Sequence, residues 1–121
     1  MDMSFKEECQ KLYDYYVVCY RRGDAKGCAS VFAAEAEMYS RFGPPAIGRQ
    51  AIEDTHAEWV AEGAEDKHIT VCSAGRDGEL GWCLVEFSEG TTGAGVSLNV
   101  LARQPDGRWL VTHISLNETH S

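Results

Sequence analysis

Few residues of this chain have side chains suited to chemistry, and one of the four histidines stands apart from the others. His56 falls in a stretch from about Gly48 to Glu62 whose apolar residues recur at helical spacing, so a helix would turn it toward the interior. A neutral imidazole can accept a proton near pH 7 with little tuning, which makes His56 a candidate general base. A histidine on an apolar face is more often a hydrogen-bonded core residue, and that alternative stays open.

Two other groupings of polar residues look like sites at first. His113, Ser115 and Asn117 alternate along one expected strand, but residues on one strand face seldom supply a complete nucleophilic relay, so serine hydrolase chemistry is not expected. His68 and Cys72 would lie about 13 Å apart on an extended strand, too far to share one metal ion. We therefore expect no metal site and no cofactor.

Composition narrows the classes of partner. The chain has 121 residues with 11 basic and 19 acidic side chains, which gives a formal charge of −8. Such a charge repels nucleic-acid phosphates and acidic membrane surfaces, so neither is expected as a partner. Five cysteines without a CxxC pair indicate reduced thiols, and no secretory hydrophobic segment is visible near the start. We therefore expect a cytoplasmic protein.

The first third of the chain is expected to hold two helices. Ser4, followed three residues later by Glu7, is typical of a capping box, and apolar residues then recur at spacings of three and four as far as Tyr20. Gly23-Asp24 can end this helix and cap the next one. That short second helix is expected to end in Val31–Ala33.

A change of period marks the switch from helix to strand. From Ala36 to Phe42 alternate residues share one apolar face, as in a half-buried strand. After the third helix come four long alternating segments: His68–Ala74, Leu80–Ser88, Gly95–Gln104 and Arg108–Asn117. The turns between them include two Asp-Gly pairs, which are typical of hairpins. This order predicts a single α+β domain over residues 1–121, with helices on one face of a bent sheet.

Four of these features together resemble a known superfamily. They are Gly23-Asp24, Phe32-Ala33 before an alternating strand, Gly48-Arg49-Gln50-Ala51-Ile52, and Pro105-Asp106-Gly107-Arg108-Trp109. Over nearly its whole length the chain resembles the cone-shaped α+β barrels that include nuclear transport factor 2, ketosteroid isomerase and the SnoaL-like polyketide cyclases. The resemblance implies a cystatin-like fold, in which a curved mixed sheet wraps around three helices. None of the motifs is catalytic, and this fold hosts many unrelated functions.

The resemblance also implies where a site would lie. In ketosteroid isomerases a carboxylate base moves a proton beside an enolate, which a tyrosine and a protonated aspartic acid stabilise. By this resemblance, the family's tyrosine corresponds to Tyr16, its base to Ser40 and its second donor to a position near Asn99. A further pocket position, a tyrosine in the family, corresponds to His56. Ser40 cannot replace a carboxylate base by itself, so steroid isomerisation by the family mechanism is not expected.

The candidate residues divide into two sets. The expected catalytic groups are His56, Tyr16 and Asn99, and the expected substrate-binding groups are Ser40, Phe42, Trp59 and Tyr20.

The last strands carry apolar residues on both faces. Alternation places Leu98 and Val100 opposite Asn99, whereas the resemblance places Asn99 inside the cone. Both can hold if another subunit covers the outer face of the sheet, unless a bulge breaks the alternation. We therefore expect a homodimer through that face, with Trp109 and Val111 among the apolar residues that need cover.

Two functions from different classes fit these observations. The first is a cofactor-independent enzyme that moves a proton in a small, mostly apolar molecule during isomerisation, cyclisation or dehydration. The second is a non-catalytic module of the same fold, which binds a ligand or serves as a dimeric scaffold. The convergence of Tyr16, His56, Ser40 and Asn99 on one open cavity would favour the enzyme.

Overall fold

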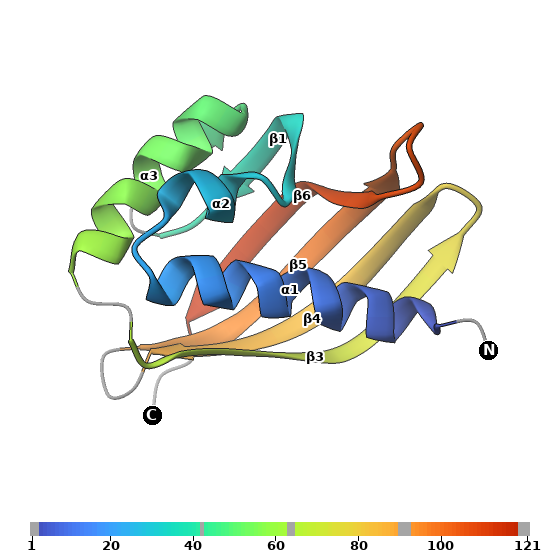
Figure 1. Cartoon of the computed structure of the whole chain (residues 1–121), viewed down its shortest axis with the longest axis horizontal. Coiled ribbons are helices and arrows are strands. Elements are labelled where there is room, and N and C mark those ends of the chain that lie inside the picture. Colours follow the sequence, from blue (N-terminus) through green and yellow to red (C-terminus); the bar gives the residue numbers. More distant parts are fainter. Residues whose placement is uncertain (1–2, 42, 63–64, 90–92, 119–121) are drawn as a thin grey trace.

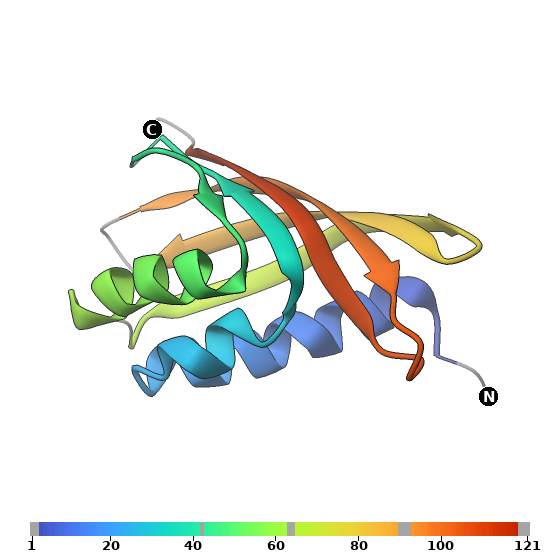
Figure 2. The same cartoon turned by 90° about the horizontal axis from the view of Figure 1, so that it is seen from above.

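A curved sheet wraps around three helices (Figures 1 and 2). The computed structural model describes residues 3–41, 43–62, 65–89 and 93–118. In chain order the elements are α1 (Phe5–Arg21), α2 (Ala25–Ala29), β1 (Phe32–Tyr39), β2 (Ala46–Ile47), α3 (Arg49–Ala61), β3 (Lys67–Asp77), β4 (Leu80–Glu89), β5 (Ala94–Arg103) and β6 (Trp109–Glu118). This α+β layout, with the helices on the concave face, confirms the predicted fold class.

The sheet is mixed, with the strands in the order β2-β1-β6-β5-β4-β3. Only β1 and β6 pair in parallel, and every other pair among the described strands is antiparallel. The last four strands form the predicted antiparallel meander. Among the helices, α2 contacts both α1 and α3. No helix in the described part of the chain is long and apolar enough to cross a membrane.

The helix signals in the sequence correspond to caps in the structure. The Ser4 hydroxyl accepts a hydrogen bond from the backbone N–H of Glu7 at 3.2 Å, so α1 starts where the capping box predicts. Gly23 has a φ of 72°, a conformation that glycine adopts without a Cβ clash, and it ends the helical run. Asp24 then caps α2 by accepting from the N–H of Gly27 at 2.9 Å.

The boundary between α2 and β1 differs from the prediction. The helix ends at Ala29 rather than in Val31–Ala33, and β1 already begins at Phe32. The cause is tertiary, because the carbonyl of Val31 accepts from the N–H of Val111 in β6 at 2.9 Å. Val31 therefore pairs with β6 instead of continuing the helix by another turn. Phe42, expected at the end of this strand, lies outside the described residues.

A bulge in β6 changes which residues face outward. The pairing with β5 jumps from Val100↔His113 to Leu101↔Val111, so Thr112 is an extra residue. Val111 is therefore fully buried, and Trp109 is only 8% exposed, although His113 lies on the outer face. The expectation that Trp109 and Val111 need cover from another subunit is wrong. Because of the bulge, these two side chains face the interior, whereas His113 faces outward.

The free edge of β3 is occupied by side chains from α1. The Gln10 amide donates to the carbonyl of Ile69 at 3.2 Å and accepts from the N–H of Val71 at 2.7 Å. Arg21 adds a third bond, from Nε to the carbonyl of Lys67 at 2.9 Å. Gln10 thus takes the place that a residue of a neighbouring strand would take, and it fixes α1 against the sheet.

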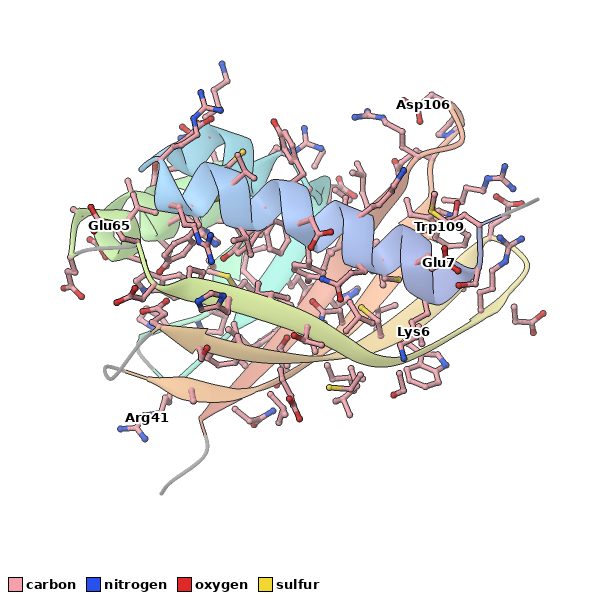
Figure 3. All side chains as sticks on the ribbon, turned by 60° about the horizontal axis from the view of Figure 1, so that its bottom comes forward. Lys6, Glu7, Arg41, Glu65, Asp106 and Trp109 are labelled. Carbon is pink, nitrogen blue, oxygen red and sulfur yellow. The ribbon has the colours of Figure 1, made fainter. Side chains whose placement is uncertain are left out.

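Aromatic packing closes the sheet at the end where α1 begins. The rings of Phe5 and Trp109 meet edge to face, with centroids 4.8 Å apart, and the Arg76 guanidinium lies 5.2 Å from the Trp109 ring. Trp109 lies beside the start of α1, away from Arg41 and Glu65 at the other end (Figure 3). Aromatic side chains therefore fill this end of the structure.

We expect Gln10→Ala to lower the free energy of unfolding by about 2 kcal/mol, because it leaves the N–H of Val71 without its acceptor. Gln50→Ala on α3 is the matched control. Both glutamines donate to an aspartate four residues on, at 2.9 Å and 3.0 Å, but Gln50 makes no bond to a strand. Its loss should cost no more than about 0.5 kcal/mol. Urea unfolding of both variants measures the difference, and equal effects would contradict this role for Gln10.

Candidate functional site

The interior face of α1 carries three buried tyrosines, at positions 13, 16 and 20. Spacings of three and four place them in one row against the sheet and α3. A buried hydroxyl needs a hydrogen-bond partner, and each of these reaches a different element: Tyr13 donates to Asn99 Oδ1 on β5, Tyr16 lies 2.7 Å from His56 Nε2 on α3, and Tyr20 donates to Glu89 Oε1 on β4 at 2.7 Å.

The hydrogen bonds of His56 determine which of its nitrogens carries the proton. Nδ1 lies 2.8 Å from the backbone carbonyl of Ile52, and a carbonyl oxygen can only accept, so Nδ1 is the protonated nitrogen. In the neutral ring Nε2 is then an acceptor, and the Tyr16 hydroxyl donates to it. The lone pairs of the Tyr16 oxygen remain available to a donor in the interior.

Burial keeps both members of this pair neutral. His56 is 0% exposed. Desolvation lowers the pKa of its imidazole to about 4, with the charge of Lys67 contributing in the same direction. Desolvation also raises the pKa of the Tyr16 hydroxyl well above its usual range. The proton between them therefore stays on Tyr16, and at pH 7 the pair is an uncharged relay of two hydrogen bonds.

Asn99 faces inward, as the resemblance implies, but it lies behind Tyr13. Its Oδ1 accepts from the Tyr13 hydroxyl, and its Nδ2 lies 3.1 Å from Ser97 Oγ, 3.3 Å from the Ser97 carbonyl and 3.4 Å from the Cys83 carbonyl. Both ends of the amide are thus engaged. Any effect of Asn99 on a ligand would pass through Tyr13 or Ser97.

A small inner cavity lies among these groups. Its volume is about 20 Å³, room for about one water molecule. The polar residues Tyr13, Tyr16, His56, Lys67 and Ser97 line it, and its other walls are apolar: Phe32, Met38, Trp59, Ile69, Val85, Phe87, Ile114 and Leu116. As the structure stands, the interior is too full for an organic ligand.

A larger outer hollow of about 300 Å³ adjoins the inner cavity. Ser40 lines this hollow, together with residues of α3 and the segment before β2. Met38 and Trp59 line both spaces, so their side chains form the partition between them. The structure therefore brings Tyr16, His56 and Trp59 together, and it leaves Ser40 on the far side of the partition.

A buried lysine belongs to the same interior, and the sequence reasoning missed it. Lys67 is 4% exposed, its Nζ lies 2.8 Å from Glu89 Oε1, and Tyr20 donates to the same oxygen. Burial lowers the pKa of Lys67. Burial also acts to raise the pKa of Glu89, but its hydrogen bonds from Lys67 and Tyr20 and the lysine charge lower it overall. The sequence feature that could have revealed it is the alternation Lys67, Ile69, Val71. It extends the inward face of the strand to a residue just before His68, where the strand was predicted to start.

The remaining reactive side chains lie outside this group. His113 is exposed on the outer face, 3.6 Å from Glu37, and Ser115 and Asn117 are exposed beside it. Four cysteines, at positions 9, 19, 28 and 83, are buried free thiols. Within the described ranges no three histidine, cysteine, aspartate or glutamate residues gather as metal ligands would.

The depressed pKa of His56 makes stability depend on pH. The unfolded chain binds a proton on His56 below about pH 6.5, whereas the folded protein resists it down to about pH 4. The stabilisation is therefore complete above about pH 6.5 and is lost as the pH falls through 4, amounting to about 3 kcal/mol. We expect the stability gap between the wild type and His56→Gln to shrink by about that much from pH 7 to pH 4. Urea unfolding across this range measures the gap. The exposed His113→Gln is the control, and a gap independent of pH would mean that His56 is solvated.

Solved structures share this architecture, although no protein-family model matches the chain and no curated protein matches its sequence. A domain of unknown function with a cystatin-like fold from Nostoc punctiforme has a TM-score of 0.80 at 15% identity, over 99% of this chain and 81% of that one. A ketosteroid isomerase-like protein from Erwinia carotovora atroseptica has a TM-score of 0.77 at 12% identity, covering 96% and 97%. An NTF2-like protein of unknown function from Pseudomonas putida has a TM-score of 0.76 at 16% identity, covering 99% and 92%. At these identities the likeness shows the fold alone, a cystatin-like fold that this chain shares with ketosteroid isomerase-like and NTF2-like proteins.

Proposed function

We propose that this protein binds a small, mostly apolar organic molecule that carries one hydroxyl or carbonyl oxygen. The observation that carries the proposal is the Tyr16–His56 pair, two neutral polar groups held together at 2.7 Å in a largely apolar interior. Ligand sites commonly combine apolar walls with a few placed polar groups of this kind. The Tyr16 oxygen can accept from a ligand hydroxyl while its own hydrogen remains hydrogen-bonded to His56 Nε2. Rotation of the same hydroxyl would present that proton to a carbonyl oxygen.

The ligand would enter through the partition between the two spaces. Movement of Met38 and Trp59 would join the inner cavity to the outer hollow of about 300 Å³, a volume at the lower end of ordinary ligand pockets. Met38 has an unbranched, flexible side chain that can repack around different shapes. Ser40 would then contact the part of the ligand that remains in the outer hollow.

Proton-transfer catalysis is the second candidate, as an isomerase, cyclase or dehydratase without a cofactor. The position of the Tyr16 hydroxyl favours it, because after rotation away from His56 its proton could stabilise negative charge that develops on a ligand oxygen. His56 itself is a weak base, with a pKa of about 4 and its acceptor nitrogen already in use. A binding or scaffold module without catalytic turnover is therefore the function that the geometry supports best.

Tyr16→Phe should weaken the binding of cyclohexanol about fivefold, because one ligand hydrogen bond of roughly 1 kcal/mol is lost. Binding is measured by methyl NMR shifts of Val85 and Ile114, which line the cavity. Tyr15→Phe is the matched control, since Tyr15 is the adjacent residue of α1 and 52% exposed. Methylcyclohexane, which lacks the hydroxyl, should bind both variants equally. Failure of both compounds to shift the cavity methyl groups would refute the proposed site.

We also propose that a second copy of the chain covers the outer face of the sheet. Exposed apolar side chains gather there on β4 and β5: Leu80, Trp82, Leu98 and Val100 are 61%, 44%, 49% and 36% exposed. Trp82 pairs with Val100 across these strands, so the residues are contiguous. Self-association would remove this apolar surface from water. The buried free thiols fit a reducing compartment, and we place such a dimer in the cytoplasm.

Leu98→Glu should convert the dimer to a monomer, because it would bury a charge in the proposed contact. Val18→Glu is the matched control, because Val18 is 50% exposed, similar to Leu98, but lies on α1 away from the sheet's outer face. Sedimentation equilibrium at micromolar protein should give twice the chain mass for the wild type and for Val18→Glu. A wild-type monomer would refute the dimer.

A further inference from the structure

The surroundings of Lys67 differ from those of an ordinary buried ion pair. Its Nζ lies 4.5 Å from the centre of the Tyr20 ring and 5.1 Å from that of Phe87, and it donates to Glu89 at 2.8 Å. An ammonium group has three N–H donors. Among the described residues, Glu89 is its only hydrogen-bond acceptor, and the rings occupy two further sides.

Lys67 thus has one hydrogen-bond acceptor among the described residues, and it also lines the inner cavity. A stable buried ion pair normally has its remaining donors satisfied by further hydrogen bonds. Lys67 instead lines the same cavity as Tyr16 and His56. Desolvation favours the neutral, nucleophilic form of the Lys67 amine, and it outweighs the opposing effect of Glu89, so that the pKa of Lys67 is lowered overall.

We infer that Lys67 captures a carbonyl ligand covalently as an imine, so that the compounds taken by this site are small apolar ketones and aldehydes. This inference rests on the proposed binding function and names its ligand class. The apolar walls would hold the hydrocarbon part, and the carbonyl carbon would face Nζ. Burial, which lowers the pKa of Lys67, increases the share of the reactive neutral amine.

Lys67 and Glu89 together supply and recover every proton that imine formation requires. Glu89 takes one proton from the ammonium group, and the freed lone pair of Nζ forms a bond to the carbonyl carbon. A proton moves from nitrogen to the former carbonyl oxygen, which gives a neutral carbinolamine. Glu89 then returns its proton to that hydroxyl, the C–O bond breaks, and water leaves. The products are a protonated imine, a glutamate carboxylate and one water, so no oxidant or reductant is needed.

Tyr20 acts in this scheme as a positioning residue. Its hydroxyl donates to Glu89 Oε1, the oxygen that also accepts from Lys67. The carboxylate is thereby held against the amine. The Glu89 side chain is 31% exposed, so the released water has a path to solvent.

Reduction of the imine with sodium cyanoborohydride tests the inference directly. The protein is incubated with cyclohexanone at pH 7, the imine is reduced to a stable secondary amine, and each lysine is examined by peptide mass spectrometry. The chain has three other lysines, Lys6, Lys11 and Lys26, all exposed, which serve as internal references. We expect Lys67 to be labelled severalfold faster than these, because burial lowers its pKa and so raises the share of the neutral amine.

Two variants separate chemistry from folding. Lys67→Arg keeps a positive charge beside Glu89 but has no primary amine, so it should show no label at position 67 while Lys6, Lys11 and Lys26 are labelled as in the wild type. Glu89→Gln should slow the labelling of Lys67 while the exposed lysines react as before. Unchanged labelling in Glu89→Gln would remove Glu89 from the scheme.

The outcomes distinguish this inference from the function on which it rests. Cyclohexanol binding together with label only on exposed lysines would overturn the imine and leave Lys67 as a structural ion pair. Absence of cyclohexanol binding, with Lys67 unlabelled, would overturn the proposed binding site as well. Rapid label on Lys67 that the Glu89→Gln variant slows would support the imine.

Discussion

Three tyrosine side chains of α1 are buried in the interior, and the arrangement of the site follows from the need of their hydroxyls for hydrogen-bond partners. A hydroxyl buried without a partner costs more than its hydrogen bond contributes, so each must be matched by the sheet or by α3. Asn99, His56 and Glu89 are the partners, and they come from three elements far apart in the chain. The same hydrogen bonds that hold α1 against the sheet therefore also position the polar groups of the cavity.

The protonation states of the site have the same origin. With Nδ1 of His56 bonded to a backbone carbonyl and Nε2 to Tyr16, neither nitrogen is free for a direct exchange with solvent. Charge is confined to Lys67 and Glu89, where the carboxylate is only partly buried. The interior is thus divided into a neutral part that suits hydrogen bonding and a charged part at the start of β3.

The sequence predicted the fold in most respects because periodicity and turn chemistry are local properties. The caps at Ser4 and Asp24 and the two Asp-Gly hairpins are properties of a few adjacent residues. The start of β1 at Phe32 was not predictable in this way, since it depends on a hydrogen bond to Val111, far along the chain. The burial of Val111 was missed for a related reason, because one extra residue at Thr112 reverses the strand alternation.

The candidate site could be predicted only in part. Periodicity alone placed His56 and Tyr16 on interior faces, but their mutual hydrogen bond depends on where the fold places α3 relative to α1. Lys67 was missed because a charged residue at the start of a strand ordinarily lies in solvent. The partition formed by Met38 and Trp59 is a packing property, which no spacing rule contains.

The glutamine on the edge of β3 also affects how this protein can meet other chains. An open strand of eleven residues would be a template for strand addition, and through it for domain exchange or fibril growth. Gln10 and Arg21 already form hydrogen bonds with backbone groups of Ile69, Val71 and Lys67. An incoming strand would need these same groups. The opposite edge, β2, is only two residues long. Contacts with other molecules are thereby directed to the broad surfaces of the sheet, where side chains determine which partner is accepted.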